Sequence, residues 1–324
     1  MFAGFQDQWT PVAFSRALRM NAPLGRRIAG TPVALFRDSA GEAHALVDQC
    51  PHRGVRLSLG TVQDGCLTCP FHAWRFDGAG SCVEIPLSTM PTEKLERYAA
   101  TPIPLREAGG VLWVFTGATA VGEPPVPEAT RIAKARRYEV TQTWNVHWTR
   151  AMENMLDSPH VPFLHRRTIG RFVRPLLKPG STMDVAIETT PQGFRTVSTI
   201  DGRPPTGSWL DWLRPNGMCL NIPIPKGIWR IHAFCVPVDE QTTEMMVFSV
   251  RTFLPWMPAF IMDRVNKRIL DEDRAVLESS QPPIVPPAGD EMSVASDRAT
   301  LAFRRWYFRT LVEGKPEPVS LLPG

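Results

Sequence analysis

The sequence lacks any long apolar stretch. No run of about eighteen apolar residues occurs in its 324 residues, so we expect no membrane-spanning helix. Met1–Asp7 has neither the basic nor the apolar segment of a signal peptide, and we therefore expect a cytoplasmic protein. No charge of one sign dominates either. The formal net charge is +4, and Lys and Arg are spread along the chain rather than gathered into a basic stripe, which argues against nucleic acid as a partner.

Motifs for accepting electrons from a nicotinamide are also missing. The chain has no strand-associated Gly-x-Gly-x-x-Gly and no Cys-x4-Cys-x2-Cys of the plant ferredoxin type. Cysteine is scarce, with six residues in all. Cys82, Cys219 and Cys235 are scattered through apolar or mixed runs, where we expect small buried side chains rather than a disulfide framework. A reducing compartment is consistent with this pattern.

The composition is otherwise that of a soluble globular protein. Hydrophobic residues make up 43% and charged residues 21% of the chain, and the length allows one large or two moderate domains. The 32 prolines are about twice the usual frequency of roughly 5% and predict a turn-rich chain. Sixteen phenylalanines and ten tryptophans indicate aromatic cores.

Four residues near the N-terminus carry the strongest chemical signal. Cys50 and His52 form a Cys-x-His pair. After sixteen intervening residues, Cys69 and His72 form a Cys-x-x-His pair. Two thiolates can bind one iron of a [2Fe–2S] cluster while two imidazoles bind the other. Each pair must lie in a tight loop, and the prolines and glycine of Cys-Pro-His-Arg-Gly and Cys-Pro-Phe-His suit such turns.

A zinc site or a redox dithiol is the competing interpretation of these cysteines. Cys66 lies three residues before Cys69, which creates a Cys-x-x-Cys pattern. A zinc ribbon would need a second such pair at matching spacing, and none follows. We therefore expect Cys66 to be a strand residue that leads into the second loop.

The chain is expected to fold as two domains joined by a linker. Short β-like segments separated by Gly, Pro and Asp turns predict an all-β domain over residues 1–118. The Pro-rich stretch that begins near Gly117 predicts a linker, placed at 119–137. Strands and two helices, about 147–156 and 259–280, predict an α+β domain over 138–324, with helices packed on one side of a sheet. The strands expected in the two domains are 32–37, 43–48, 66–70, 83–86, 110–115, 184–189, 194–200, 218–224, 229–238 and 245–253. A strand-like stretch that begins near residue 138 is expected to lead into the first helix.

A second metal site is suggested in the second domain. Ser158 is suited to cap a helix that begins with Pro159, which would place His160 and His165 just inside that helix. Five residues correspond to about 140° on an ideal helix, so the backbone near Pro162 would have to bend for both imidazoles to reach one ion. Taken alone, the pair is equally compatible with structural histidines.

The long helix offers a third ligand. Ile261, Val265, Ile269 and Leu277 recur at i, i+4 spacing, and Asp273 occupies a position on this apolar stripe. A buried carboxylate is costly unless it is paired or bound to a metal. A buried salt bridge with Arg274 or another arginine is the alternative. The acidic neighbours of Asp273, residues 271 and 272, are expected to point away.

These two sites together resemble the Rieske non-haem iron oxygenases, specifically the catalytic α subunits of the short monooxygenase and O-demethylase group. The second cluster loop continues Ala-Trp-Arg-Phe-Asp, close to the family pattern, and the family motif Asn/Glu-x-x-Asp-x-x-His-x4-His is matched throughout. The resemblance implies a Rieske domain followed by a helix-grip-like catalytic domain, a [2Fe–2S] cluster and a mononuclear Fe(II). The residues that match the second motif are Asn154, Asp157, His160 and His165, with Asp273 as the implied third ligand in a 2-His-1-carboxylate set.

The resemblance also implies an assembly and a reaction. Such subunits form homotrimers in which Asp157 would bridge His72 of a neighbouring copy and an iron-ligand histidine; a plain surface residue is the alternative. A separate NAD(P)H-dependent reductase, with or without a ferredoxin, would deliver electrons, and Arg53 and Arg75 either form a positive rim for it or are solvated turn residues. The implied activity is hydroxylation or oxidative demethylation of an organic substrate with O2. An aromatic-ring dioxygenase, or an electron-transfer protein without the mononuclear iron, is the alternative.

Pocket residues are harder to predict. Asn221 and His232 lie on expected strands of the second domain, and Trp256 precedes the long helix. We expect these three, with Trp209, Trp212 and Trp229 as further candidates, to face the substrate. No cluster of cations stands out as a clamp for a carboxylate, which favours a neutral, bulky, apolar substrate such as a terpenoid, a steroid or an aromatic ether.

Overall fold

The chain forms two compact units, 1–126 and 127–324, in a computed structural model. The structure describes residues 1–203, 207–254, 256 and 259–316. Among these, every helix is too short or too polar to traverse a lipid bilayer. The boundary between the units lies inside the segment expected to be a linker, although η4 (Glu128–Arg131) and the start of β11 (Arg136–Trp144) also fall within it. The domain limits proposed from the sequence stay a prediction.

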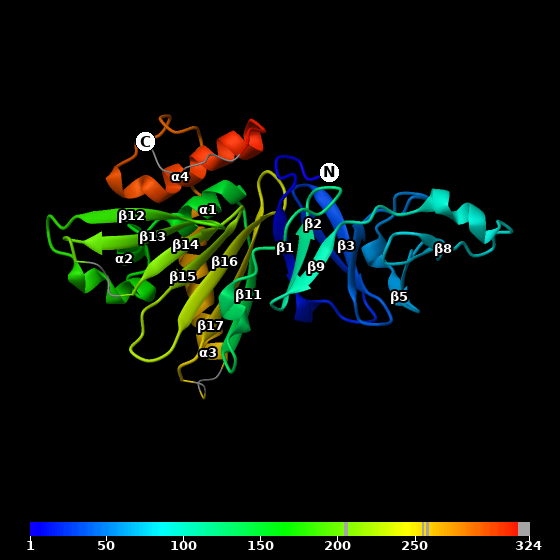
Figure 1. The fold of residues 1–324 in the computed structure, drawn as a ribbon, viewed down its shortest axis with the longest axis horizontal. Helices are drawn as coiled ribbons and strands as arrows, with labels where there is room; N and C mark the ends of the chain where they lie inside the picture. The colour runs from blue at the N-terminus through cyan, green and yellow to red at the C-terminus, as the bar shows by residue number, and fades with distance from the viewer. Residues whose placement is uncertain (204–206, 255, 257–258, 317–324) are drawn as a thin grey trace. The chain divides into compact units, whose positions relative to one another are not determined.

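The first unit consists of antiparallel β-sheets (Figure 1). One sheet has the order β1-β10-β9, a second β2-β3-β4 and a third β5-β6-β7-β8. The all-β character predicted for this part of the chain is confirmed. The strands are β1 (Trp9–Phe14), β2 (Leu24–Ile28), β3 (Thr31–Arg37), β4 (Ala43–Val47), β5 (Thr61–Gln63), β6 (Cys66–Thr68), β7 (Arg75–Phe76), β8 (Cys82–Glu84), β9 (Leu105–Ala108) and β10 (Val111–Phe115).

An apolar cluster between these sheets supports the two Cys/His loops. Phe36, Leu46, Leu67 and Phe76 are fully buried there, and Cys50 and Cys69 belong to the same cluster. The first loop follows β4, and the second connects β6 to β7. Each loop is therefore tied to the core through its cysteine.

The second unit is built on one seven-stranded antiparallel sheet with the order β11-β17-β16-β15-β14-β13-β12. Of the strands in this sheet, the sequence prediction missed β14. This strand has only five residues, and its apolar pattern is interrupted by Asp211, which is too short a pattern to distinguish it from a loop. The remaining strands of this sheet are β12 (Met183–Thr190), β13 (Gly193–Ile200), β14 (Trp209–Leu213), β15 (Gly217–Asn221), β16 (Trp229–Pro237) and β17 (Thr243–Arg251).

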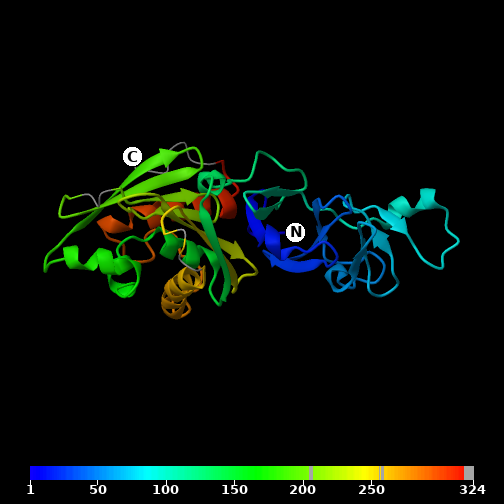
Figure 2. The same cartoon turned by 90° about the horizontal axis from the view of Figure 1, so that it is seen from below.

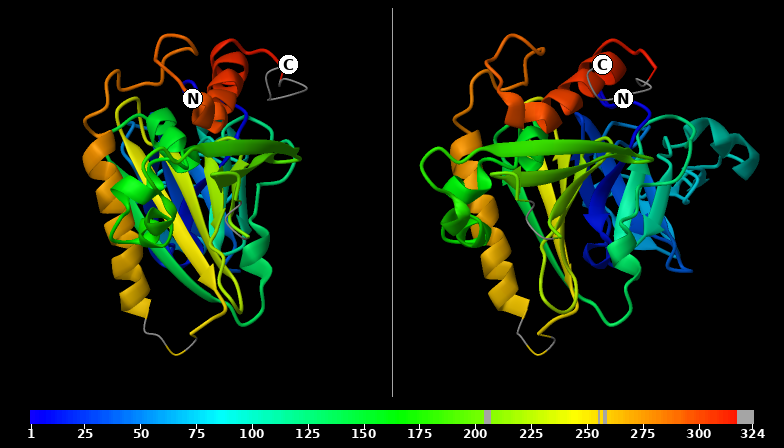
Figure 3. Two further views of the ribbon diagram at one scale, coloured as in Figure 1. Left: turned by 90° about the vertical axis from the view of Figure 1, so that its left-hand side faces the viewer. Right: turned by 60° about the vertical axis from the view of Figure 1, so that its left-hand side comes forward.

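Helices cover one face of this sheet. The helices α1 (Trp148–Leu156), α2 (Val161–Leu164) and α3 (Ala259–Leu277) lie on the same side (Figures 2 and 3). This arrangement confirms the predicted α+β class. Strand pairing shows which side chains share the helix-covered face: Cys235 is opposite Met245, and Ile231 is opposite Ser249. Ser249 receives a hydrogen bond from Asn266 of α3, which fixes the side on which α3 packs.

Two further helical segments close the unit, and the sequence prediction missed both. They are α4 (Arg298–Trp306) and the π-helical turn η8 (Tyr307–Val312). Phe303 and Trp306 of α4 pack edge-on against Trp212 of β14. Buried ion pairs join α4 to α1: Arg304 binds Glu153 of α1 and Glu291, and Arg150 of α1 binds the same two carboxylates.

His147 caps α1 and gives this unit a dependence on pH. Its Nδ1 accepts a hydrogen bond from the Thr149 backbone N–H at 3.3 Å. Burial lowers the pKa of His147 to about 4. Because the folded protein favours the neutral imidazole, His147 stabilises the fold fully above its ordinary pKa of 6.5, and this contribution is lost as the pH falls from 6.5 to about 4.

His147→Asn is expected to flatten that part of the stability profile. Asparagine is also a good N-cap but carries no titratable group. Between pH 7 and pH 4 the wild type should lose on the order of 2 kcal/mol more of its unfolding free energy than the variant does. Urea unfolding of both proteins at a series of pH values measures the difference. Parallel profiles would contradict the assignment.

Candidate metal centres

The two cluster loops have the same backbone hydrogen-bond pattern. Cys50 donates its N–H to the carbonyl of Val55, and Cys69 donates to that of Trp74. Four residues after each cysteine, the N–H of Gly54 or Ala73 returns to the cysteine carbonyl. Both of these residues have a positive φ, +70° and +54°, which glycine adopts freely and alanine only with strain. The chain thus builds two matching tips that present a thiol and an imidazole each.

The side chains of these tips fit a [2Fe–2S] cluster. The Cys50 and Cys69 thiols are buried, and the rings of His52 and His72 have centroids 4.7 Å apart. Nδ1 of His52 is buried and has no hydrogen-bond partner within the described ranges, as expected of a nitrogen that is reserved for a metal. Burial, together with the adjacent Cys69, raises the pKa of the Cys50 thiol to about 11, so the thiolate needs iron to stabilise it at neutral pH.

Neighbouring side chains hold the loops in place. The Trp74 ring stacks on His52 at 4.5 Å with an interplanar angle of 4°. Arg75 forms ion pairs with Asp64 and Glu84, at 2.9 and 3.0 Å, and donates to a backbone carbonyl of β5. Its charge is therefore balanced locally, which weakens the positive rim considered for Arg75. Cys66 begins β6, as expected.

A second group of ligand atoms converges in the second unit. Nε2 of His165 lies 3.0 Å from Oδ1 of Asp273 and 3.3 Å from Nε2 of His160, and the remaining pair, His160 Nε2 and Asp273 Oδ1, is 3.6 Å apart. Asp273 is 1% exposed, and among the described residues no arginine forms an ion pair with it; Arg274 binds Glu278 instead. Two imidazoles and a carboxylate at these distances form a donor set suited to a ferrous ion.

The local fold around the two histidines differs from the predicted one. Helix α1 ends at Leu156, and α2 is a single turn, with His160 before it and His165 after it. The prediction that both histidines lie inside a helix is therefore wrong. Pro162, in the first turn of α2, has no N–H to donate to residue 158, so α2 cannot extend backwards toward α1. The helix lasts for one turn, and the Nε2 atoms of both rings lie 3.3 Å apart.

The buried face of α3 is also displaced by one position from the predicted stripe. Asn266, Leu270 and Asp273 are buried, whereas Ile261 is 40% exposed and the other stripe residues are only half-buried. The three buried residues follow i, i+4 and i+7 spacing along α3. Asp273 belongs both to this row and to the predicted stripe, so its predicted burial is confirmed.

Each imidazole has a carboxylate on its second nitrogen. Oδ2 of Asp157 lies 3.0 Å from Nδ1 of His160 and also accepts the His160 backbone N–H. Oε2 of Glu272 lies 2.9 Å from Nδ1 of His165 and accepts the Thr168 hydroxyl. Such contacts fix the tautomer in which Nε2 is free to bind a metal. Both bonds therefore orient the two rings toward one point.

Glu272 corrects the sequence prediction, which had this side chain pointing away from the site. Its carboxylate is further anchored by Arg268 at 3.2 Å. Burial raises the pKa of Glu272, but its hydrogen bonds with His165, Thr168 and Arg268 outweigh this, and its net pKa is lowered. The carboxylate is thus held ionised against His165. The acidic pair 272–273 was the only available sequence signal, because His165 lies far away in the chain.

Glu272→Ala is expected to loosen the metal site without emptying the cluster. Loss of the contact frees the His165 ring to rotate, and we expect iron affinity at this site to fall about 10- to 100-fold. Equilibrium dialysis against ferrous ion, with ultraviolet–visible absorption to confirm that the cluster is intact, measures the effect. Asp271→Ala, on the exposed side of the same helix, is the matched control and should keep wild-type affinity. Equal losses in both variants would contradict the assigned role.

The residues expected to face a substrate lie elsewhere. His232 pairs with Cys219, and Asn221 pairs with Arg230, so all four project from the sheet face opposite α3. Asn221 and His232 therefore do not share the sheet face that α3 covers, and their pocket roles stay a prediction. His232 instead stacks on Phe248, with ring centroids 4.7 Å apart.

The tryptophan candidates are also distributed differently. Trp256 is 75% exposed and does not belong to the buried interior around Asp273. Trp209 lies under the guanidinium of Arg195 at 4.1 Å, on the face away from the helices. Trp212 is a core residue under α4. Asn154, in the last turn of α1, has a buried Nδ2 without a hydrogen-bond partner among the described residues. Its place in the catalytic motif stays a prediction.

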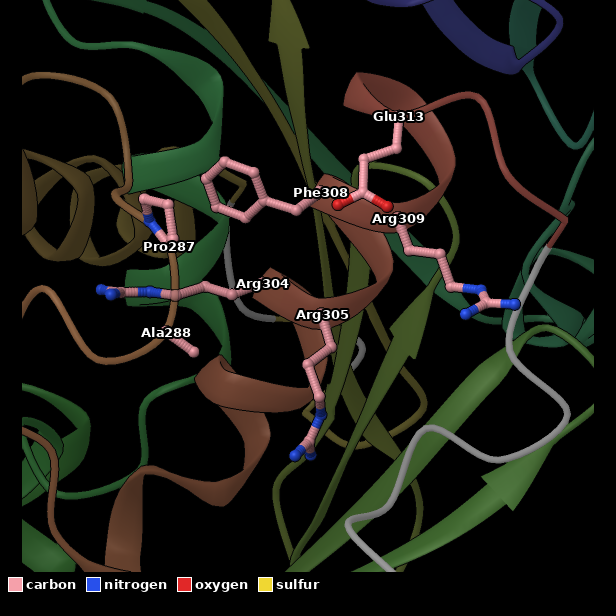
Figure 4. A pocket seen from close by; sticks show the side chains of 7 residues that line it. All are labelled: Pro287, Ala288, Arg304, Arg305, Phe308, Arg309 and Glu313. Atoms are coloured by element: carbon pink, nitrogen blue, oxygen red, sulfur yellow. The ribbon is translucent and has the colours of Figure 1, made fainter.

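A pocket of about 440 Å³ lies beside α4, away from the metal ligands. Figure 4 shows the guanidinium groups of Arg304, Arg305 and Arg309 pointing in three different directions from its wall. Arg304 is already bound to Glu153 and Glu291. Because these cations do not converge, the pocket is not a carboxylate clamp.

Comparison with known proteins identifies the same two parts of the chain. The Rieske [2Fe-2S] domain family matches residues 8–98, which include all four cluster ligands. The family described as "Vanillate O-demethylase oxygenase C-terminal domain" matches residues 144–218 and 208–313, which include both histidines and Asp273.

Individual relatives extend this similarity over most of the chain. The oxygenase component of dicamba O-demethylase from Stenotrophomonas maltophilia is 34% identical over 299 residues, which cover 85% of this chain and 87% of that protein. Chlorophyllide a oxygenase of Chlamydomonas reinhardtii is 28% identical over 320 residues, 94% of this chain but 48% of that protein. The chain spans less than half the length of the first curated relatives that it matches.

Among solved structures, NdmA of Pseudomonas putida CBB5 has a similar fold. The TM-score is 0.80 at 22% sequence identity, with 95% of this chain and 91% of that chain covered. At this level of identity the similarity concerns the fold.

Proposed function

Because the chain belongs to the Rieske non-haem iron oxygenases, we propose that it is the oxygenase component of a monooxygenase that hydroxylates or oxidatively demethylates an organic substrate with O2. One observation carries the proposal. His160, His165 and Asp273 bring three ligand atoms within 3.6 Å of one another. The Asp273 carboxylate is buried, and no cationic Lys or Arg side chain among the described residues pairs with it. An electron-transfer protein would not need this second centre.

The ligand residues of each centre indicate its chemical role. A cluster held by Cys50, His52, Cys69 and His72 would supply single electrons, and a ferrous ion held by His160, His165 and Asp273 would supply the site for O2 activation. His72 is exposed while the cysteines are buried, so electrons have a direct exit through an imidazole. Glu272 and Asp157 keep the two ligand rings oriented.

A bulky, apolar substrate is the class that we favour. The sheet face under α3 is formed by apolar side chains near Asp273, which can bind such a molecule and exclude water from the reacting atoms. The similarity to chlorophyllide a oxygenase and dicamba O-demethylase supports organic ring compounds as the general class. We propose that one oxygen atom enters the substrate and the other leaves as water.

The proposed assembly is a homotrimer in the cytoplasm. Asp157 already contacts one ligand histidine of its own chain, and His72 of a second copy would complete the bridge between the centres. The six cysteines are free, which fits a reducing compartment. A separate NAD(P)H-dependent reductase, and a ferredoxin where that reductase requires one, would supply electrons, since the chain has no nicotinamide-binding motif.

Turnover with labelled oxygen tests the function. The iron-loaded protein is mixed with NADH, a ferredoxin reductase and its ferredoxin, and a panel of methoxy-aromatics, N-methyl compounds and polycyclic lipids under 18O2. The expected result is one labelled atom in a directly hydroxylated product. A methylated substrate should instead give an unlabelled demethylated product and formaldehyde, which carries the new oxygen atom. Two labelled atoms in a cis-diol would instead identify a ring dioxygenase. NADH consumption without any oxygenated product across the panel would contradict a monooxygenase of this substrate class.

A further inference from the structure

A polar pair lies on the sheet face beneath α3. Asn266 of α3 is 3% exposed, and its Nδ2 donates to Oγ of Ser249 on β17 at 3.2 Å. Between this pair and the level of Asp273, the described side chains of β15, β16 and β17 on this face are apolar or carry a thiol. They are Met218, Leu220, Ile231, Ala233, Cys235, Met245 and Val247.

The carboxamide of Asn266 has an unused acceptor. Its Oδ1 is buried and has no hydrogen-bond partner in the part of the chain that the structure describes. An unpaired buried carbonyl is destabilising, so it needs a reason to persist in a packed interior. Ser249 holds only the amide nitrogen, which fixes the plane of the group and leaves the oxygen available.

The position of Asn266 relates this acceptor to the metal site. Asn266 precedes Asp273 by seven residues, which is about two helical turns, so both side chains point from the same face of α3 and lie about 10 Å apart along the axis. Leu270 is buried on that face between them. On the sheet face, Ala233 lies two residues from Ile231, the partner of Ser249, and contributes only a methyl group.

We propose that Asn266 is a specificity-determining residue, whose carboxamide hydrogen-bonds one uncharged polar group of the substrate at the end of the apolar strip away from the metal. This inference rests on the proposed oxygenase function, since it names the substrate class for the same site. Among its described side chains the strip itself has no cation for an anionic substrate. Arg251, two residues beyond Ser249 on the same face, is held by the Tyr138 hydroxyl and by the backbone carbonyls of Phe253 and Leu254. The substrate is therefore a neutral molecule with an apolar body and a hydroxyl or N–H donor at one end.

The spacing also limits the size of the substrate. Part of the roughly 10 Å is taken up by the hydrogen bond at one end and by the approach of the reacting carbon to the ligand set at the other. The remaining span matches about two fused rings. A methyl ether at one end of such a molecule would lie near the histidines while a hydroxyl at the other end reaches Oδ1 of Asn266.

A matched pair of probes tests this arrangement. 6-Methoxy-2-naphthol carries the hydroxyl, and 2-methoxynaphthalene lacks it. Their fluorescence reports binding to the anaerobic, iron-loaded protein, so no turnover is required. We expect the wild type to bind the naphthol about tenfold or more tightly than the methoxynaphthalene, because only the former satisfies the buried acceptor.

Asn266→Leu should abolish this preference, with the ratio of Kd values falling to about one or below. Ser249→Ala should reduce the preference partly, and this variant serves if Asn266→Leu does not fold. Lys267→Gln, on the exposed side of the same helix, is the control and should keep the wild-type ratio. An unchanged ratio in both test variants would overturn the proposal, as would a wild type that binds neither probe or binds both equally. A protein that shows the preference but never oxygenates would overturn the proposed function alone.

Discussion

Replacing Asp273 with alanine is expected to leave a coloured protein with an intact Rieske spectrum and no measurable oxygenation. The carboxylate is the only anionic ligand of the second centre, and its Oδ1 lies 3.0 Å from Nε2 of His165. Two histidines alone hold ferrous ion weakly, so turnover should fall below about 1% of the wild-type rate. The cluster ligands belong to the other compact unit and should be unaffected.

Stability separates this loss from misfolding. Without a metal, Asp273 still contacts His165 at 3.0 Å, so the metal-free variant should unfold cooperatively at the temperature of the metal-free wild type or somewhat below it. Asp271→Ala is the matched control: it removes one charge from the exposed side of the same helix and should keep both iron and activity. A variant Asp273→Ala that retained oxygenation would exclude this residue from the ligand set.

Asp157→Asn is expected to separate metal content from turnover. Asparagine is nearly the same size as aspartate. Its amide oxygen can take the place of Oδ2 of Asp157, which lies 3.0 Å from Nδ1 of His160, and can still orient the His160 ring. Both metals should therefore remain bound. The negative charge that we propose to link His160 to His72 of a second copy is lost, and we expect turnover to fall at least about 100-fold.

Rapid-mixing kinetics locate the step that fails. In the variant, the pre-reduced cluster should reoxidise slowly when substrate and O2 are added, while product formed by hydrogen peroxide, which bypasses the cluster, should persist. Asp157→Glu tests rescue by a longer carboxylate and should recover part of the rate. Wild-type cluster oxidation in Asp157→Asn would remove the bridging role.

The parts of the molecule that could be predicted from the sequence are those encoded by short-range patterns. All four cluster ligands lie in two short loops, and the prolines and glycine of these loops predict the turns. The structure brings the ligand side chains together. Asp273 was predictable because a carboxylate among apolar residues requires compensation. His160 and His165 are five residues apart, so a single bent turn suffices to join them.

The parts that could not be predicted depend on contacts between distant elements. Glu272 looks like a surface residue until His165, 107 positions earlier in the chain, is placed beside it. Asn221 and His232 were assigned to a pocket by residue type, but strand register decides which face they occupy, and a single position reverses it. The arginines of α4 suggest an exposed segment, and the sequence therefore did not predict a buried helix. Arg304 can be buried because it forms ion pairs with Glu153 and Glu291, which lie far from it in the chain.

The iron and acid-labile sulfide content of the anaerobically reconstituted protein tests the central claim most directly. We predict about three irons and about two sulfides per chain in the wild type, and about two irons with unchanged sulfide in Asp273→Ala. A wild type with about two irons per chain, all accounted for by the cluster, would contradict the oxygenase assignment.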